Sequence, residues 1–216
     1  MTDDPGVDLY WIPLGAGRRF VRFNDKVYEA ITAYFQHRPR CDVYHSALAI
    51  TVPAGRFMVE MTPIPAMRSE RGVVAEGPVG LHALGRFRIF RYEVRRWLDG
   101  LVPDLTDAVA SPIRVTGDVN VALRVFDVLP QVPGRMWGRD ELHAGEMWTC
   151  NSIISWALTA AGVDTAGIPL PAHARAPGWD AGTEVGRRGP GRAAHCCAAD
   201  RRLRFHIRRT DEGART

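Results

Sequence analysis

The chain has 216 residues, a formal net charge of +4 and 46% hydrophobic residues, which is enough to bury the core of one globular domain. No apolar run approaches the roughly 18 residues that a transmembrane helix needs, so we expect no transmembrane segment. Residues 181–216 contain nine arginines and four acidic residues, so the excess positive charge of the chain lies in this tail. We therefore expect one domain over residues 1–180 and a basic, disordered tail over residues 181–216.

Strand patterns dominate the first half of the chain. Leu9 to Phe23 predicts two strands around a turn at Gly15-Ala16-Gly17, and helical spacing of apolar residues predicts a helix over Tyr28 to Gln36. Two further strands, joined at Pro53-Ala54-Gly55, and a later one are predicted over Asp42 to Val52, Arg56 to Thr62 and Arg86 to Trp97. Ser69 to Leu84 has the glycine and proline content of a loop.

Helix patterns dominate the second half. One helix is predicted over Val119 to Val128 and ends before Pro130, and a second begins at Cys150 after an irregular connection over Val132 to Glu146. Past Ile168 the prolines and glycines predict weak order. The fold class expected from this order is α+β, with a small antiparallel sheet packed on helices.

The helix that begins at Cys150 is the most informative element. Thr149 is the predicted N-cap, and Gly162 stands where a left-handed residue would end the helix. Cys150 therefore lies where backbone N–H groups and the positive end of the helix dipole favour a thiolate, which is the nucleophilic form of cysteine. The alternative is that Cys150 is a small buried hydrophobic residue.

A nucleophilic thiol needs a base and a polar group that orients the base, and a hairpin supplies candidates. If Ala54-Gly55 is a two-residue turn, His45 shares a strand face with Glu60 and Thr62. In that register Thr62 lies diagonally across from His45, and Glu60 lies about 13 Å further along, beyond direct contact unless another turn moves the register. The alternatives are a solvent-facing Glu60 and a hydrogen-bonded core histidine at position 45.

Three motifs, in this order, resemble the circularly permuted branch of the NlpC/P60 papain-like superfamily, most closely the bacterial YiiX-like group. They are His45-Ser46-Ala47-Leu48, then Met58-Val59-Glu60-Met61, then Cys150-Asn151-Ser152-Ile153-Ile154 with a helix end at Ala161-Gly162. The resemblance covers about Val43 to Asp164. Asn151 stands where the family usually has serine, and Met61 replaces a small residue.

The resemblance implies a papain-like fold with Cys150 as nucleophile, His45 as base and Glu60 as the residue that orients the base. It implies hydrolysis or transfer of an amide or ester acyl group through an acyl-enzyme. We expect a small-molecule, lipid or peptide acyl substrate, no cofactor and no nucleic acid. The alternative is a binding or scaffold module that keeps the fold without the chemistry.

The four cysteines and the two ends of the chain bear on its compartment. Cys41, Cys150, Cys196 and Cys197 lack the C-x-x-C spacing of zinc or redox sites, so we expect reduced thiols and no metal. The acidic opening, Met1-Thr2-Asp3-Asp4, predicts no export signal and hence a cytoplasmic protein. The arginine-rich tail is open to a second interpretation, as an arm for nucleic acid or an acidic membrane.

Overall fold

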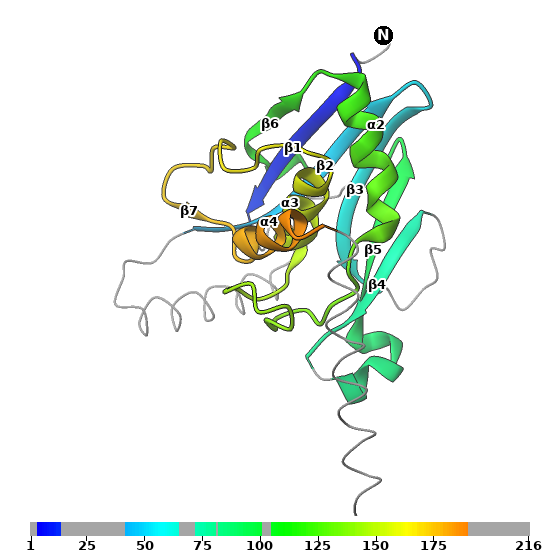
Figure 1. Cartoon of the computed structure of the whole chain (residues 1–216), viewed down its shortest axis with the longest axis vertical. Helices are drawn as coiled ribbons and strands as arrows, with labels where there is room; N and C mark the ends of the chain where they lie inside the picture. The colour runs from blue at the N-terminus through cyan, green and yellow to red at the C-terminus, as the bar shows by residue number, and fades with distance from the viewer. Residues whose placement is uncertain (1–3, 14–41, 65–71, 81, 101–104, 190–216) are drawn as a thin grey trace, which may run out of the picture.

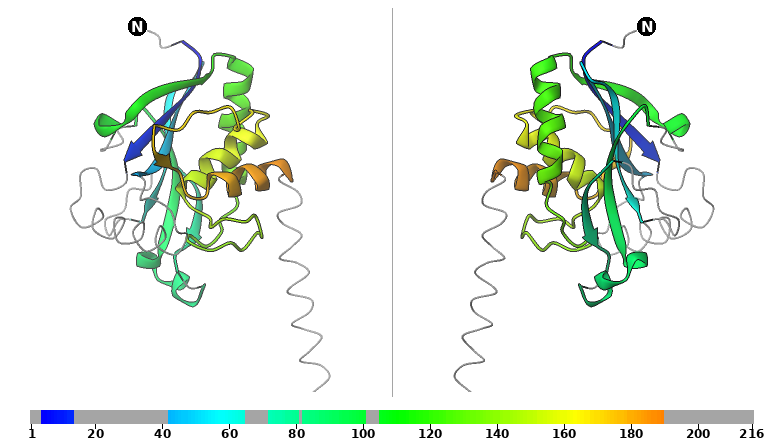
Figure 2. Two further views of the ribbon diagram at one scale, coloured as in Figure 1. Left: turned by 90° about the vertical axis from the view of Figure 1, so that its left-hand side faces the viewer. Right: turned by 90° about the vertical axis from the view of Figure 1, so that its right-hand side faces the viewer.

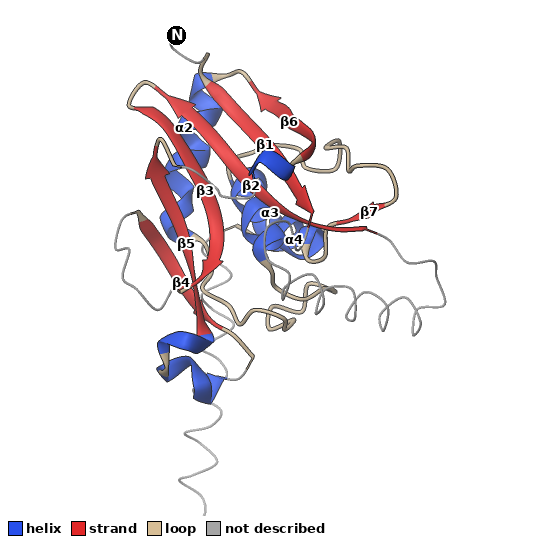
Figure 3. Ribbon diagram, turned by 180° about the vertical axis from the view of Figure 1, so that it is seen from behind, coloured by secondary structure: helices blue, strands red, loops and turns tan. Residues whose placement is uncertain are grey.

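A computed structural model describes residues 4–13, 42–64, 72–80, 82–100 and 105–189. These residues form an α+β fold in which a sheet carries its three described helices on one face (Figures 1 and 3). The strands are β1 (Gly6–Pro13), β2 (Asp42–Val52), β3 (Gly55–Pro63), β4 (Val73–Pro78), β5 (Arg91–Leu98), β6 (Val109–Thr116) and β7 (Ala174–Arg175). The helices are α2 (Val119–Val128), α3 (Cys150–Ala160) and α4 (Trp179–Arg187). None of the described helices has the length and apolarity to cross a membrane.

The sheet places β2 at its centre. Its order is β4-β5-β3-β2-β1-β6 with antiparallel neighbours, and the short β7 runs parallel to the start of β2. The β2–β3 hairpin turns at Pro53-Ala54, because Val52 pairs with Gly55. The predicted turn was therefore wrong by one residue and the register by two, which leaves every side chain on its predicted face because the strand period is two.

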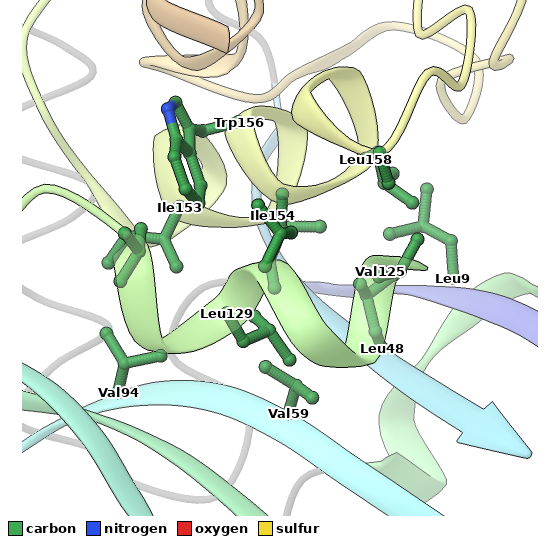
Figure 4. Packing of buried hydrophobic residues seen from close by; sticks show 14 of the residues in the cluster. Leu9, Leu48, Val59, Val94, Val125, Leu129, Ile153, Ile154, Trp156 and Leu158 are labelled. Carbon is green, nitrogen blue, oxygen red and sulfur yellow. The ribbon is translucent and has the colours of Figure 1, made fainter. Parts of the chain in front are cut away.

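Successive side chains of β1 and β2 point to opposite faces of the sheet and so contribute to two separate apolar clusters. Tyr44, Leu48 and Ile50 of β2 belong to the main core, which the sheet shares with α2 and α3. Figure 4 shows Ile153, Ile154 and Leu158 of α3 within this layer, beside residues of α2, of the 3-10 helix that follows it and of the sheet: Leu9, Leu48, Val59, Val94, Val125 and Leu129. Ala47 and Ala49 point the other way and join a smaller cluster with Tyr10, Ile12 and Met58. We call the sheet face with the helices the inner face and the opposite face the outer face.

Several predicted elements are confirmed, and the structure adds others. β2, β3, α2 and the helix at Cys150 occur as predicted, whereas β4 lies within the predicted loop and β6 was not predicted. Both missed strands are at the edges of the sheet, where the proline and glycine that they contain are tolerated. The predicted strand over Arg86 to Trp97 begins only at Arg91, because Arg86 ends one short 3-10 helix and Arg88–Phe90 form a second. The predicted strand after Gly17 and the helix over Tyr28 to Gln36 lie outside the described residues.

The predicted domain boundary at residue 180 falls inside α4. This helix packs along α3 through glycines four residues apart, Gly178, Gly182 and Gly186. A Cβ atom at Gly182 would lie 2.0 Å from the backbone oxygen of Ser152, so only glycine allows this approach. The ordered body therefore extends at least to Gly189, and the expected disorder of the rest of the tail concerns residues outside the described part.

Candidate functional site

The first turn of α3 is held by a network of short polar side chains. Thr149 is the N-cap, as predicted, and its Oγ1 accepts from the backbone N–H of Asn151 at 3.1 Å. The Ser152 Oγ accepts from the backbone N–H of Thr149 at 2.9 Å, which completes a capping box. The same two hydroxyls donate to the backbone oxygens of Pro177 and Gly178, both at 2.7 Å. These bonds join the start of α3 to the start of α4.

Asn151 joins the same turn to the sheet. Its side-chain nitrogen donates to the backbone oxygen of Tyr44 at 2.9 Å and to that of Pro177 at 3.1 Å. Its side-chain oxygen accepts from the Ser46 Oγ at 2.9 Å. Tyr44 and Ser46 flank His45 on β2, so these bonds hold the Cys150 end of α3 against the part of β2 that carries His45. The sequence pattern did not predict this role for Asn151, and the position of the residue next to the cysteine was the only signal for it.

Cys150 is the first residue of α3 and is half-buried. Its Sγ lies 4.0 Å from the side-chain oxygen of Asn151. An 11-residue helix begins at this thiol, so the partial positive charge of the helix N-terminus favours its thiolate form. The predicted placement of the thiol at a helix N-terminus is confirmed.

Glu146 is a second ionisable group beside this turn. Its carboxylate accepts from the backbone N–H of Gly178, the residue before α4, at 2.9 Å. Burial raises the pKa of Glu146, and the hydrogen bond from Gly178 opposes that rise. The carboxyl group therefore lies close to the starts of both helices, a position that the sequence pattern did not indicate.

His45 lies on β2 between two residues that face α3. It pairs with Ile12 of β1 and, by alternation, shares the outer face with Ala47. The imidazole is half-buried, and burial lowers the pKa of His45 to about 4, so the ring is neutral at pH 7. A neutral imidazole can accept a proton, which is what a general base must do.

The residues predicted to orient His45 lie on the same outer face. Ala49 pairs with Met58, and the same register extended along the two strands would put Glu60 opposite Ala47 and Thr62 opposite His45. The hydrogen-bonded ladder ends at Leu48 and Val59, before these positions, so β2 has no paired β3 residue at His45. In this register Glu60 is two residues along the strand from His45 rather than four, which halves the separation of about 13 Å that we expected.

Two residues of β5 complete a polar group on the outer face. Glu60 pairs with Arg95 and Thr62 with Glu93 in the β3–β5 ladder, and Glu93 is buried in an ion pair with Arg95. A buried charge is tolerated when it is paired in this way. The structure therefore gathers His45, Glu60 and Thr62 on one face, while Cys150 approaches β2 from the other.

Two hollows open elsewhere on the described surface. One, of about 690 Å³, lies between α4 and the loops around Gly145 and Ile168. The other, of about 660 Å³, lies between Gly80 and the loop over residues 136–141. Cys150 lines neither of them. Among the described residues, no group of three or more His, Cys, Asp or Glu side chains is arranged to hold a metal ion.

Comparison of the whole chain with family models, with curated proteins and with solved structures finds no match in any of the three.

Proposed function

We propose that this protein is a cysteine hydrolase or acyltransferase with a papain-like arrangement of its catalytic groups. The observation that carries the proposal is a pair of hydrogen bonds, one donated by the Asn151 amide to the Tyr44 oxygen and one accepted by Asn151 from the Ser46 hydroxyl, which hold the Cys150 end of α3 against the strand of His45. The half-burial of Cys150 at the N-terminus of α3 supports it, because a thiol in this position is activated yet remains accessible.

In the proposed reaction the Cys150 Sγ attacks the carbonyl carbon of an amide or ester, and His45 takes the thiol proton. The leaving amine or alcohol receives that proton as its bond to the carbonyl carbon breaks, and a thioester remains on Cys150. Water completes hydrolysis, or an acceptor nucleophile completes acyl transfer. Backbone N–H groups at the start of α3 are suited to stabilise the oxyanion.

For this reaction the His45 imidazole must reach the Cys150 Sγ from the opposite face of the sheet. The strand position of His45 directs its side chain to the outer face, so the imidazole must pass around the edge of β2 that precedes Leu48. That edge has no β3 residue paired to it, because the β2–β3 ladder ends at Leu48. Glu60 or Thr62, on the same face as His45, would hold the imidazole in the reactive orientation.

The pH dependence of Cys150 alkylation, followed by mass spectrometry, tests the proposal. We expect a thiol pKa at least one unit below the usual value of about 8.5, and a return toward that value in His45→Ala. His82→Ala, which removes an exposed imidazole, is the matched control and should leave the profile unchanged. Glu60→Gln and Thr62→Ala then show which residue orients His45.

A second candidate function is a binding module without chemistry. It is favoured by the positions of Cys150 and His45, which lie on opposite sides of the sheet at β2. It predicts an ordinary, slow thiol whose profile is the same in the native chain and in His45→Ala. Formation of a thioester on Cys150 from an activated ester such as p-nitrophenyl acetate, lost in Cys150→Ser, would exclude it.

A further inference from the structure

A small lobe formed by residues 82–90 projects from the body. It consists of two short 3-10 helices, His82–Arg86 and Arg88–Phe90, between β4 and β5. Figures 1, 2 and 3 show it extending beyond the ends of β4 and β5, away from the three described helices. We call these residues the 82–90 lobe.

The lobe exposes three large apolar side chains to different extents. Ile89 is 79% exposed, Phe87 47% and Phe90 37%. The helix Arg88–Phe90 contains no buried residue. Three large apolar side chains gathered at one projecting point are unusual on a surface that faces only water, and such patches typically mark interaction sites.

Arginines alternate with these apolar residues. The sequence Arg86-Phe87-Arg88-Ile89-Phe90-Arg91 contains no acidic residue, and neither does the rest of the lobe. Arg91 is paired with Glu76. Among the described residues, Arg86 and Arg88 form no ion pair, and the Arg86 guanidinium lies over the Phe87 ring, 4.7 Å from its centroid. The tip of the lobe is therefore both apolar and positively charged.

The body holds the lobe in place. The backbone N–H of Val79 donates to the oxygen of Phe90 at 2.8 Å, which closes the base of the lobe. His82 is bonded to Glu141, whose other carboxylate oxygen accepts from the backbone N–H of Met136 at 2.9 Å. The exposed side chains are thus presented from a fixed base, whose residues His82 and Ala83 line the hollow of about 660 Å³ together with Glu141.

We propose that the 82–90 lobe docks the protein reversibly on a membrane surface that contains anionic lipid. Phe87, Ile89 and Phe90 enter the interfacial region of the bilayer, and Arg86 and Arg88 contact lipid phosphates. A projecting tip of three apolar residues is too small for a stable protein interface, which buries about 800 Å² on each partner. It is suited to a soft planar surface, where aromatic and apolar residues insert and neighbouring arginines add electrostatic attraction.

This docking does not depend on the chemistry proposed for Cys150, because it requires only the exposed residues of the lobe. It also differs from the tail hypothesis, which places membrane contact in the arginines beyond residue 181. The two can be separated because the lobe lies between β4 and β5, far in sequence from the tail.

Co-sedimentation of the full chain with phosphatidylcholine vesicles, with and without 30% phosphatidylserine, tests the proposal. We expect binding only to the vesicles with phosphatidylserine, and weaker binding at high salt. Ile89→Ser should lower the partition coefficient roughly ten-fold, equivalent to about 1.4 kcal/mol, and Arg88→Gln roughly five-fold. The control Leu123→Ser, which changes an exposed leucine on α2, should leave binding unchanged.

Three outcomes would overturn the proposal. One is no binding to phosphatidylserine vesicles at low salt. Another is binding that survives Ile89→Ser and Arg88→Gln but disappears when residues 190–216 are removed, which would assign the contact to the tail. The third is a dimer, detected by light scattering without lipid, that Ile89→Ser dissociates, which would make a second copy of the chain the partner. Because all three altered side chains are exposed, thermal unfolding should be unchanged and serves as the folding control.

Discussion

Replacing Asn151 by alanine tests whether its hydrogen bonds hold α3 on the sheet. Asn151 is 1% exposed and bonds to Tyr44, Ser46 and Pro177. Alanine leaves the Tyr44 oxygen and the Ser46 hydroxyl without this partner, at about 1–2 kcal/mol each, whereas the Pro177 oxygen keeps its bond from Thr149, so we expect the free energy of unfolding to fall by about 2–4 kcal/mol. For a chain of this size, that corresponds to a loss in Tm of about 4–16 °C, measured by circular dichroism or calorimetry.

Asn120→Ala is the matched control, because Asn120 is exposed in the first turn of α2 and only its backbone N–H takes part in the cap. It should change the free energy of unfolding by less than about 0.5 kcal/mol. A double-mutant cycle of Asn151→Ala with Ser46→Ala should give a coupling energy of about 1 kcal/mol. A Tm for Asn151→Ala close to that of Asn120→Ala would refute the reasoning and show that apolar packing alone positions α3.

Three further predictions concern packing, pH and the domain boundary. Gly182→Ala places a Cβ against a backbone oxygen of α3 and should cost about 1–3 kcal/mol in urea unfolding, whereas Gly167→Ala, which meets open space, should be near neutral. Because burial lowers the pKa of His45 from its ordinary value of 6.5 to about 4, the unfolded state binds the proton first, so stability is retained above pH 6.5 and falls as the pH drops toward 4. The loss should approach about 3 kcal/mol and be absent in His45→Gln; an equal slope in both proteins would contradict it. A chain ending at Gly189 should keep the Tm of the full chain, whereas one ending at Asp180 loses most of α4 and should unfold well below it; equal Tm values would restore the predicted boundary.

The sequence predicted those elements whose pattern is local. Alternation defined β2 and β3, helical spacing defined α2, and Thr149 marked the start of α3, because each signal lies within about ten residues. The face shared by His45, Glu60 and Thr62 was also predicted correctly, since an error of two in register does not change a strand face. The papain-like assignment and the roles of Cys150, His45 and Glu60 stay predictions.

Edge strands and α4 were missed for a physical reason. A strand at the edge of a sheet needs only one partner, so β6 keeps Pro112 and β4 keeps Gly77, which sequence patterns treat as breaks. Gly182 would weaken an isolated helix, yet in α4 it allows the backbone to approach Ser152 of α3. A glycine of this kind is unfavourable locally and favourable only in contact with its partner helix.

The sequence by itself determined which segments alternate, which are helical, and that a cysteine begins a capped helix, because short-range sterics and capping bonds decide these features. Only the tertiary structure decided how those segments meet. In the folded protein Cys150 lies on the inner side of β2 and His45 on the outer face. Asn151 links α3 to β2 through its hydrogen bonds. The physical reason is that register, sheet order and helix contact depend on groups more than a hundred residues apart, such as Ser46 and Asn151, whose complementarity appears only when the chain is folded.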